Sequence, residues 1–269
     1  MHWLIQDGFE NDPAYNDLLD NLNRMGINYT LVKVIPFSDD GIISEIDLNT
    51  IAEPIFTYGS YTLSKIAKKR GYTPGAFLSE NSNMKNLLQH FGEEMLNCDM
   101  IFGTIGTLKP ISENFFCRPL EDTKSFTAKI MDSDDYLGFQ HRIVSFSGED
   151  AYSTITKDTE IIMSSCKNII SETRFFIVDA AIVTYSQYMV GNRVLYKADV
   201  DQYIIDYAQK MVDHYQPDIA YVLDIAVNSD GIPKVLEVNN INSSGLYAIN
   251  NQKFINAIEM LTDKYVWLT

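Results

Sequence analysis

The sequence predicts an α/β protein that begins with a small lobe built around a parallel sheet. Two observations support this prediction. In the first hundred residues, short apolar strands alternate with amphipathic helices in the order strand, helix, strand. Further along, longer strands follow one another in pairs separated by short turn sequences. Apolar residues make up 46% of the 269 and are spread along the whole chain, so we expect a fully folded protein with a sizeable core.

The elements of the first lobe follow from periodicity. We expect strands over residues 2–6, 29–35, 55–58 and 100–102, and helices over residues 13–25, 61–69 and 84–96. Pro13 fits the first turn of its helix, where its missing N–H is not needed. The alternation favours parallel pairing of these strands.

After about residue 103 the pattern changes to antiparallel pairs. Short strands are expected over residues 106–110, 115–118 and 126–131, whereas the Asp-, Ser- and Gly-rich residues 133–148 are expected to form excursions at the edge of a lobe. One hairpin pairs residues 172–178 with 182–188 around Asp179-Ala180. A second pairs residues 220–227 with 234–239 around Asp230-Gly231, and helices are expected over residues 200–214 and 252–264.

The second hairpin carries a candidate metal site. A two-residue type I′ turn centred on Asp230-Gly231 would place Asp224 directly opposite Glu237, with Asn239 two residues further on the same face. Two carboxylates across a ladder repel each other unless a positive charge lies between them. Mg²⁺ prefers such hard oxygen ligands. The alternative, that one of these carboxylates faces solvent on an edge strand, remains open.

Three cations are candidates for binding phosphate. Arg118 and Arg174 lie in apolar strands, and an arginine matches phosphate oxygens with two parallel hydrogen bonds. Lys124 lies in the polar loop between the strands and could close over phosphates. The alternative for each is a surface ion pair, for example between Arg174 and Glu172.

Composition excludes several function classes. The formal net charge of −15 disfavours nonspecific binding to nucleic acids or to anionic membranes. No apolar run approaches the roughly 20 residues that span a bilayer, and the start does not resemble a signal peptide, so we expect a cytoplasmic protein. The three cysteines lack the spacing of zinc ligands. The sequence also lacks the phosphate-loop, dinucleotide, serine-hydrolase and zinc-protease motifs.

The order of these segments resembles the ATP-grasp superfamily, specifically its phage and bacterial branch with two arginines and one lysine at the nucleotide site. The resemblance rests on FFCRPLEDTKSFT at residues 115–127, SETRFFIVDAAIVTYSQY at 171–188 and YVLDIAVNSDGIPKVLEVNNINSSGLY at 221–247. It implies an N-terminal lobe over residues 1–103 and, over residues 104–269, an ATP-grasp domain of two α+β subdomains that hold ATP between them.

The resemblance also implies roles for individual residues. Asp224, Glu237 and Asn239 would hold Mg²⁺, and Arg118, Lys124 and Arg174 would bind the phosphates. Asn242 would reach the phosphate or the acceptor. The segment between the two subdomains would contact the nucleotide through Ser165, Lys167, Ile169 and Glu172.

Three functions agree with these expectations. The first is an ADP-forming ligase that activates a carboxylate as an acyl phosphate and joins it to an amine, with a small molecule or a peptide as substrate. A kinase would need the same ATP site but a hydroxyl acceptor, and a nucleotide-binding module would show no turnover. The resemblance also leaves open a homodimer, and a place in the host cytoplasm if the chain is encoded by a phage.

Overall fold

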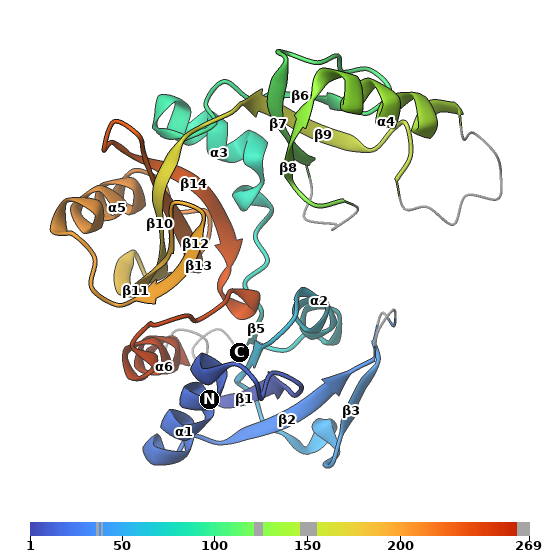
Figure 1. The fold of residues 1–269 in the computed structure, drawn as a ribbon. Helices are drawn as coiled ribbons and strands as arrows, with labels where there is room; N and C mark the ends of the chain where they lie inside the picture. The colour runs from blue at the N-terminus through green and yellow to red at the C-terminus, as the bar shows by residue number, and fades with distance from the viewer. Residues whose placement is uncertain (36–37, 39, 121–125, 146–154, 263–269) are drawn as a thin grey trace. The chain divides into compact units, whose positions relative to one another are not determined.

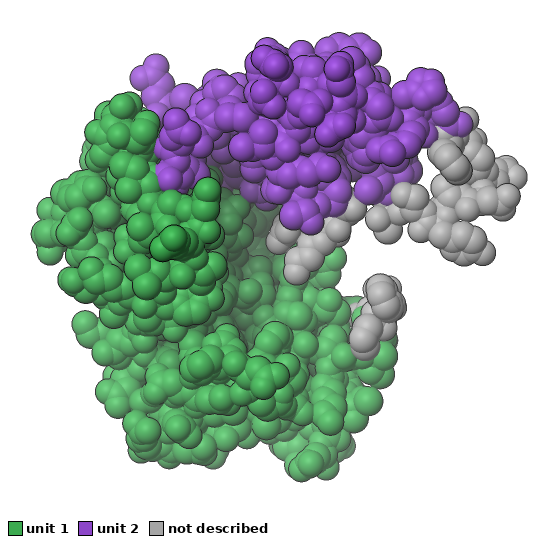
Figure 2. Space-filling view, viewed as in Figure 1, with its two compact units in different colours: residues 1–82, 170–269 green, residues 83–169 purple. Residues whose placement is uncertain are grey.

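The computed structural model describes residues 1–35, 38, 40–120, 126–145 and 155–262 (Figure 1). By internal contacts the chain divides into two compact units, one formed by residues 1–82 and 170–269 and the other by residues 83–169 (Figure 2). The first unit is thus built from the two ends of the chain.

The N-terminal part of the first unit is a five-stranded sheet with the order β3-β2-β1-β4-β5 (Figure 1). Its elements are β1 (His2–Gln6), α1 (Pro13–Met25), β2 (Tyr29–Val34), β3 (Ile42–Ser44), β4 (Ile55–Tyr58), α2 (Tyr61–Arg70) and β5 (Pro74–Gly75). The pairs of β1 with β2, β1 with β4 and β4 with β5 are parallel, and only β3 joins antiparallel to β2. The expected parallel lobe is confirmed.

Helix α1 shows how local sequence sets the limits of an element. The Asp12 side chain accepts a hydrogen bond from the Ala14 backbone N–H, and Pro13 occupies the first turn. Gly26 ends the helix with a φ of 68°, a left-handed conformation that favours glycine. The predicted bounds of this helix are therefore confirmed.

The C-terminal part of the first unit is a second five-stranded sheet with the order β12-β11-β10-β13-β14. Its elements are β10 (Ile169–Val178), β11 (Ala181–Val190), β12 (Arg193–Lys197), α5 (Gln202–His214), β13 (Ala220–Asn228), β14 (Pro233–Asn240) and α6 (Asn251–Met260). The β10–β11 hairpin turns at Asp179 and Ala180, which have φ values of 53° and 64° as a type I′ turn requires. This predicted hairpin is confirmed, although β12 was not expected.

The β13–β14 turn differs from the expected two-residue turn. The Gly231 N–H donates to the Asn228 carbonyl, and the Asn228 N–H donates to the Ile232 carbonyl, so the loop contains three residues, 229–231. This loop shifts the register by one residue. A bulge between Asp224 and Ile225 in the pairing shifts it back, so Asp224 still faces Glu237. The predicted pairing is confirmed, but the predicted turn is wrong.

A single apolar core joins the two sheets of the first unit. Trp3 and Phe56 from the N-terminal sheet lie in one cluster with Phe176 from β10, Val222 from β13 and Phe254 from α6. Trp3 packs edge-on against Phe56 at 4.6 Å between ring centroids. Helix α5 contacts β11, β13 and β14. The second sheet is therefore fixed against the N-terminal lobe on the face that carries Val222 and, two residues further, Asp224.

The second unit contains a four-stranded sheet with the order β6-β9-β7-β8. Its elements are α3 (Met84–Phe91), β6 (Ile101–Thr104), β7 (Asn114–Pro119), β8 (Lys129–Asp132), α4 (Ser133–Ser145) and β9 (Glu160–Ser165). Phe115, Met131, Tyr136 and Met163 form its core. The β7–β8 and β7–β9 pairs are antiparallel.

Three expectations for this unit are wrong. Residues 106–110 form a turn and a coil rather than a strand. Residues 133–145 form helix α4 rather than an excursion, because Tyr136 and Gln140 lie four residues apart on a buried face while the Asp132 carboxylate accepts from the Asp135 N–H at its start. The helix expected over residues 84–96 ends at Phe91, since Gly92 has a φ of 51°.

The limits of the compact units do not coincide with the expected boundary between residues 103 and 104, because residues 83–103 pack with the second unit. The assignment of residues 104–269 to one nucleotide-binding domain remains a prediction. Among the helices of the described residues, none has the length and apolar character needed to cross a membrane.

Candidate functional site

The centre of the candidate site is Asp224, in the middle of β13. Its side chain is fully buried, which is rare for a carboxylate, and it faces Glu237 on β14 across the ladder. A buried charge requires partners, because removing an ion from water costs several kcal/mol. The neighbouring strands supply these partners.

Arg174 on β10 is the first partner. Its Nε donates to Asp224 Oδ1 at 3.0 Å and its Nη2 donates to Asp224 Oδ2 at 2.8 Å, which forms a bidentate ion pair. The Arg174 side chain is 9% exposed. The ion pair expected as the alternative role of Arg174 was with Glu172, but the Arg174 partner in this structure is Asp224, and Glu172 accepts instead from the Tyr188 hydroxyl.

Asn239 connects the two carboxylates. Its Nδ2 donates to Glu237 Oε1 at 2.9 Å and lies 3.4 Å from Asp224 Oδ2. The residues predicted as metal ligands are therefore brought together on adjacent strands. A metal would require the Asn239 amide to turn its oxygen inward, since the nitrogen faces the carboxylates here.

The local charge is not balanced by Arg174. Burial raises the pKa of Asp224 to about 6, Arg174 opposes this rise, and the charges of Glu237 and Glu172 add to it. Burial alone would lower the pKa of Arg174, but the charge and hydrogen bonds of Asp224 raise it. Three carboxylates thus face one guanidinium, and this excess of negative charge, with its oxygen donors, suits a hard divalent cation such as Mg²⁺.

The ligand set for such a cation would include an amide. Within the described residues, no cluster of three or more His, Cys, Asp and Glu side chains is suited to a metal. The third ligand beside Asp224 and Glu237 would therefore have to be Asn239. Amide oxygens are ordinary ligands of hard cations, so the donor set fits Mg²⁺.

Three tyrosines that the sequence did not single out lie beside this cluster. Tyr247 stacks between Tyr188 and Tyr196, with ring centroids 5.1 and 4.8 Å apart. The Arg174 guanidinium lies 5.0 Å from the Tyr247 ring centre and 5.4 Å from that of Tyr188. Tyr247 also has a φ of 54°, which is unusual for a bulky residue and is typical of functional sites. The run of polar and aromatic residues at 184–188 was the available signal.

Asn242 is placed differently from its expected role. Its side chain is fully buried, donates to the carbonyls of Thr57 and Gly75, and accepts from the Phe77 N–H. Its own carbonyl accepts from the Gly59 N–H. In this conformation Asn242 fastens the segment after β14 to the N-terminal sheet and has no group left to reach a phosphate.

Most of the remaining candidates belong to the second unit. Arg118 is half-buried on β7, where its Nε donates to the Pro119 carbonyl. Lys167 pairs with Asp99 at 2.8 Å, and the Ser165 N–H donates to the same carboxylate. Burial alone would raise the pKa of Asp99, but the hydrogen bonds from Lys167 and Ser165 lower it.

Lys124 lies outside the described residues. Ile169 is half-buried at the start of β10, three residues before Glu172. The convergence of Arg118 and Lys124 with Arg174 therefore stays a prediction.

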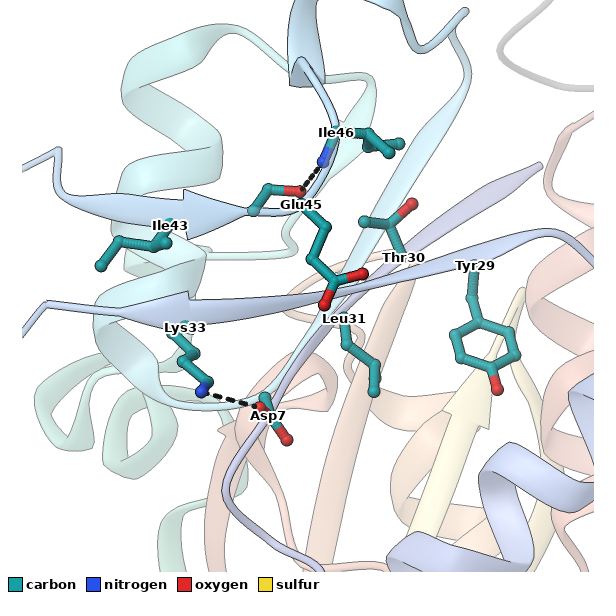
Figure 3. Close-up of a pocket in the computed structure, with 9 residues that line it drawn as sticks. Asp7, Tyr29, Thr30, Leu31, Lys33, Ile43, Glu45 and Ile46 are labelled. Atoms are coloured by element: carbon teal, nitrogen blue, oxygen red, sulfur yellow. Dashed lines mark hydrogen bonds and ion pairs between the residues drawn. The ribbon is translucent and has the colours of Figure 1, made fainter.

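A pocket of about 470 Å³ lies on the N-terminal sheet, away from these residues in sequence (Figure 3). Its lining comes from the end of β1, from β2 and from the region of β3, and it includes the pair of Lys33 and Asp7 at 3.8 Å. None of the candidate site residues lines it.

Comparison with solved structures shows the fold of the chain. A D-alanine–D-alanine ligase from Bacillus anthracis, in complex with ATP, superimposes with a TM-score of 0.62 at 12% identity and covers 100% of this chain and 97% of its own. The ATP-grasp ligase PsnB, in complex with a minimal precursor, gives 0.56 at 10% identity, with 97% and 98% covered. The D-cycloserine synthetase DcsG gives 0.56 at 12% identity, with 96% and 98% covered.

A comparison with curated proteins finds no match. A family model described as an ATP-grasp domain, the second family of its clade, matches residues 97–257, more than half of the chain. This range includes β10, β13 and β14 with Arg174, Asp224 and Glu237. The chain belongs to this family of ATP-grasp domains.

Proposed function

We propose that the chain is an ADP-forming ligase that uses Mg²⁺ and ATP to activate a carboxylate as an acyl phosphate and joins it to an amine. The observation that carries this proposal is the buried cluster of Asp224, Arg174, Glu237 and Asn239, in a chain of the ATP-grasp family. A cluster used only for stability would be unusual, since apolar residues of similar size are often at least as stable as a buried ion pair.

The roles we propose follow from position and charge. Asp224, Glu237 and Asn239 would hold Mg²⁺, which when bound neutralises and orients the phosphates of ATP. Both oxygens of Asp224 are engaged by Arg174 in the nucleotide-free structure, so metal binding must share or displace one of these bonds. A released Arg174 Nη group would then be available for the terminal phosphate.

Arg174 would act on the phosphoryl group during transfer. Charge on the phosphoryl oxygens changes as the bond to ADP breaks, and a fixed guanidinium favours the transition state without any protein nucleophile. Its fixed position comes from Asp224 on one side and from Tyr188 and Tyr247 on the other. Arg118 and Lys124 would bind the phosphates from the second unit, and Ser165, Lys167, Ile169 and Glu172 would contact the rest of the nucleotide.

The substrates are proposed by class. Similar folds occur in a D-alanine–D-alanine ligase and in PsnB, which was solved with a minimal precursor, so both a small amino acid and a peptide are reasonable acceptors to test. The net charge of −15 supports a partner other than nucleic acid.

The test is nucleotide turnover with a mixed pool of amino acids and short peptides. Wild-type protein with Mg²⁺-ATP should release ADP only when both a carboxylate and an amine are supplied, whereas a kinase would require a single hydroxyl acceptor. Glu237→Gln should lose this activity, and the matched exposed change Glu10→Gln should keep it. Release of AMP and pyrophosphate would exclude the acyl-phosphate route.

A further inference from the structure

Strand β12 is an unprotected edge next to the candidate site. It ends the sheet order β12-β11-β10-β13-β14 and, among the described residues, pairs only with β11. All five of its residues are exposed, and Val194, Leu195 and Tyr196 show 64%, 49% and 54% of their surface. Three consecutive apolar side chains on a free edge are unusual, because such an edge offers backbone groups to any extended chain.

A continuous path of contacts links this edge to the proposed phosphate-binding arginine. The Tyr196 ring stacks on Tyr247 at 4.8 Å, and the Tyr247 ring lies 5.0 Å from the Arg174 guanidinium. A register shift in the β11–β12 pairing between Val194 and Lys197 marks a bulge, a feature that redirects side chains near active sites. A chain bound along β12 would therefore pass beside the reacting groups.

The charges of β12 indicate what kind of chain it would bind. Arg193 and Lys197 stand at its two ends in a protein with 21 basic and 36 acidic residues. Arg193 forms no ion pair within the part of the chain that the structure describes, and the ion pair of Lys197 there is with Asp199, which is 85% exposed. Such an exposed pair is weak and is easily exchanged for a ligand carboxylate. The edge is therefore locally basic on an acidic molecule.

A second copy of the chain is a poor occupant of the same edge. Antiparallel pairing of β12 with β12 of another copy would bring Arg193 of each strand against Lys197 of the other, and like charges opposite one another destabilise a ladder. The net negative charge of both copies adds to this repulsion.

We propose that β12 binds an extended acidic peptide as an additional strand, and that this peptide is the substrate, with its reacting end directed toward Arg174. This inference rests on the proposed function and specifies its substrate class. Backbone hydrogen bonds to the free edge would supply affinity. The apolar side chains of Val194 and Leu195 and the two cations would select apolar residues flanked by Asp or Glu.

The test is selection from a random library of seven-residue peptides, followed by fluorescence polarisation with the enriched peptides after labelling. We expect enrichment of peptides with apolar centres and acidic ends, and loss of binding when alternate backbone nitrogens are methylated. The variant Arg193→Glu/Lys197→Glu should bind these peptides at least about tenfold more weakly, because two attractive contacts become repulsive. The matched charge change Arg24→Glu/Lys253→Glu, on exposed helix positions, should bind as wild type does.

Three outcomes would overturn the inference: no enriched peptide, equal weakening by both double variants, or a wild-type dimer in sedimentation that the β12 variant dissociates. Thermal stabilisation by Mg²⁺-ATP, measured on the same samples, separates this result from the proposed function. Peptide binding without ATP binding would contradict the ligase, and ATP binding without peptide binding would contradict only the strand addition.

Discussion

The Arg174–Asp224 pair makes a quantitative prediction about stability. Asp224 is fully buried and the Arg174 side chain is 9% exposed, so removal of either partner leaves a charge in a region that water does not reach. Breaking such a pair costs about 3–5 kcal/mol. We therefore expect Asp224→Ala to lower the free energy of unfolding by about that amount, although Glu172 and Glu237 remain close enough to compensate Arg174 partly.

A double-mutant cycle isolates the pair. Arg174→Met combined with Asp224→Leu removes both charges, so the double variant should be less destabilised than the sum of the single variants by about 2–3 kcal/mol. Urea unfolding followed by tryptophan fluorescence measures all four proteins. The matched control is the exposed pair of Arg24 and Asp20, 4.0 Å apart, whose coupling should not be measurable. A coupling below about 1 kcal/mol for the buried pair would refute the reasoning.

Three further predictions concern the turn, the thiols and turnover. Ala180→Gly should stabilise the protein by about 0.5–1 kcal/mol in urea unfolding, because alanine is strained at a φ of 64° while glycine adds some entropy to the unfolded chain; a loss of stability would contradict this. In a titration of native protein with a thiol reagent, the exposed Cys98 and Cys166 should react fast and Cys117 slowly, since burial raises the pKa of the Cys117 thiol to about 12; three equal rates would argue against its burial. Arg174→Ala should lower kcat for ADP release by about a hundredfold with a smaller change in the KM for ATP; a raised KM at unchanged kcat would assign the residue to ground-state binding.

Much of the fold could be predicted from the sequence because its signals are local. Helix α1 has its proline, its capping aspartate and its terminal glycine within the segment itself, and the predicted bounds of α1 match the structure. The β10–β11 turn was also predicted, although Ala180 occupies a position that favours glycine. Helix α4 was missed because the polar residues at its start conceal the spacing of Tyr136 and Gln140.

The pairing of Asp224 with Glu237 was predicted for a partly wrong reason. The expected two-residue turn is a three-residue loop, and a bulge in the pairing next to Asp224 restores the register. Neither feature has a clear signal in the sequence, since a bulge depends on the packing of the whole strand. The same holds for the contact of Arg174 with Asp224, because the two residues are 50 positions apart and their strands meet only in the folded sheet.

The role of Asn242 shows the limit of a family resemblance. The segment that contains it looks like a substrate-facing loop, yet its amide binds three backbone groups of the N-terminal sheet. Composition alone does not distinguish an asparagine that faces a ligand from one that satisfies buried backbone groups. The tyrosine stack was missed for a related reason, since Tyr188, Tyr196 and Tyr247 come from separate segments.

The most direct test of the central claim is calorimetric titration of the protein with ATP in the presence of Mg²⁺ and in the presence of EDTA. We predict that wild-type protein binds ATP with Mg²⁺ and at least about tenfold more weakly without it, because Asp224 and Glu237 repel the phosphates unless a cation lies between them. Glu237→Gln should lose most of this dependence. Equal affinity of the wild type with and without Mg²⁺ would contradict the assignment of Asp224, Glu237 and Asn239 as the metal site.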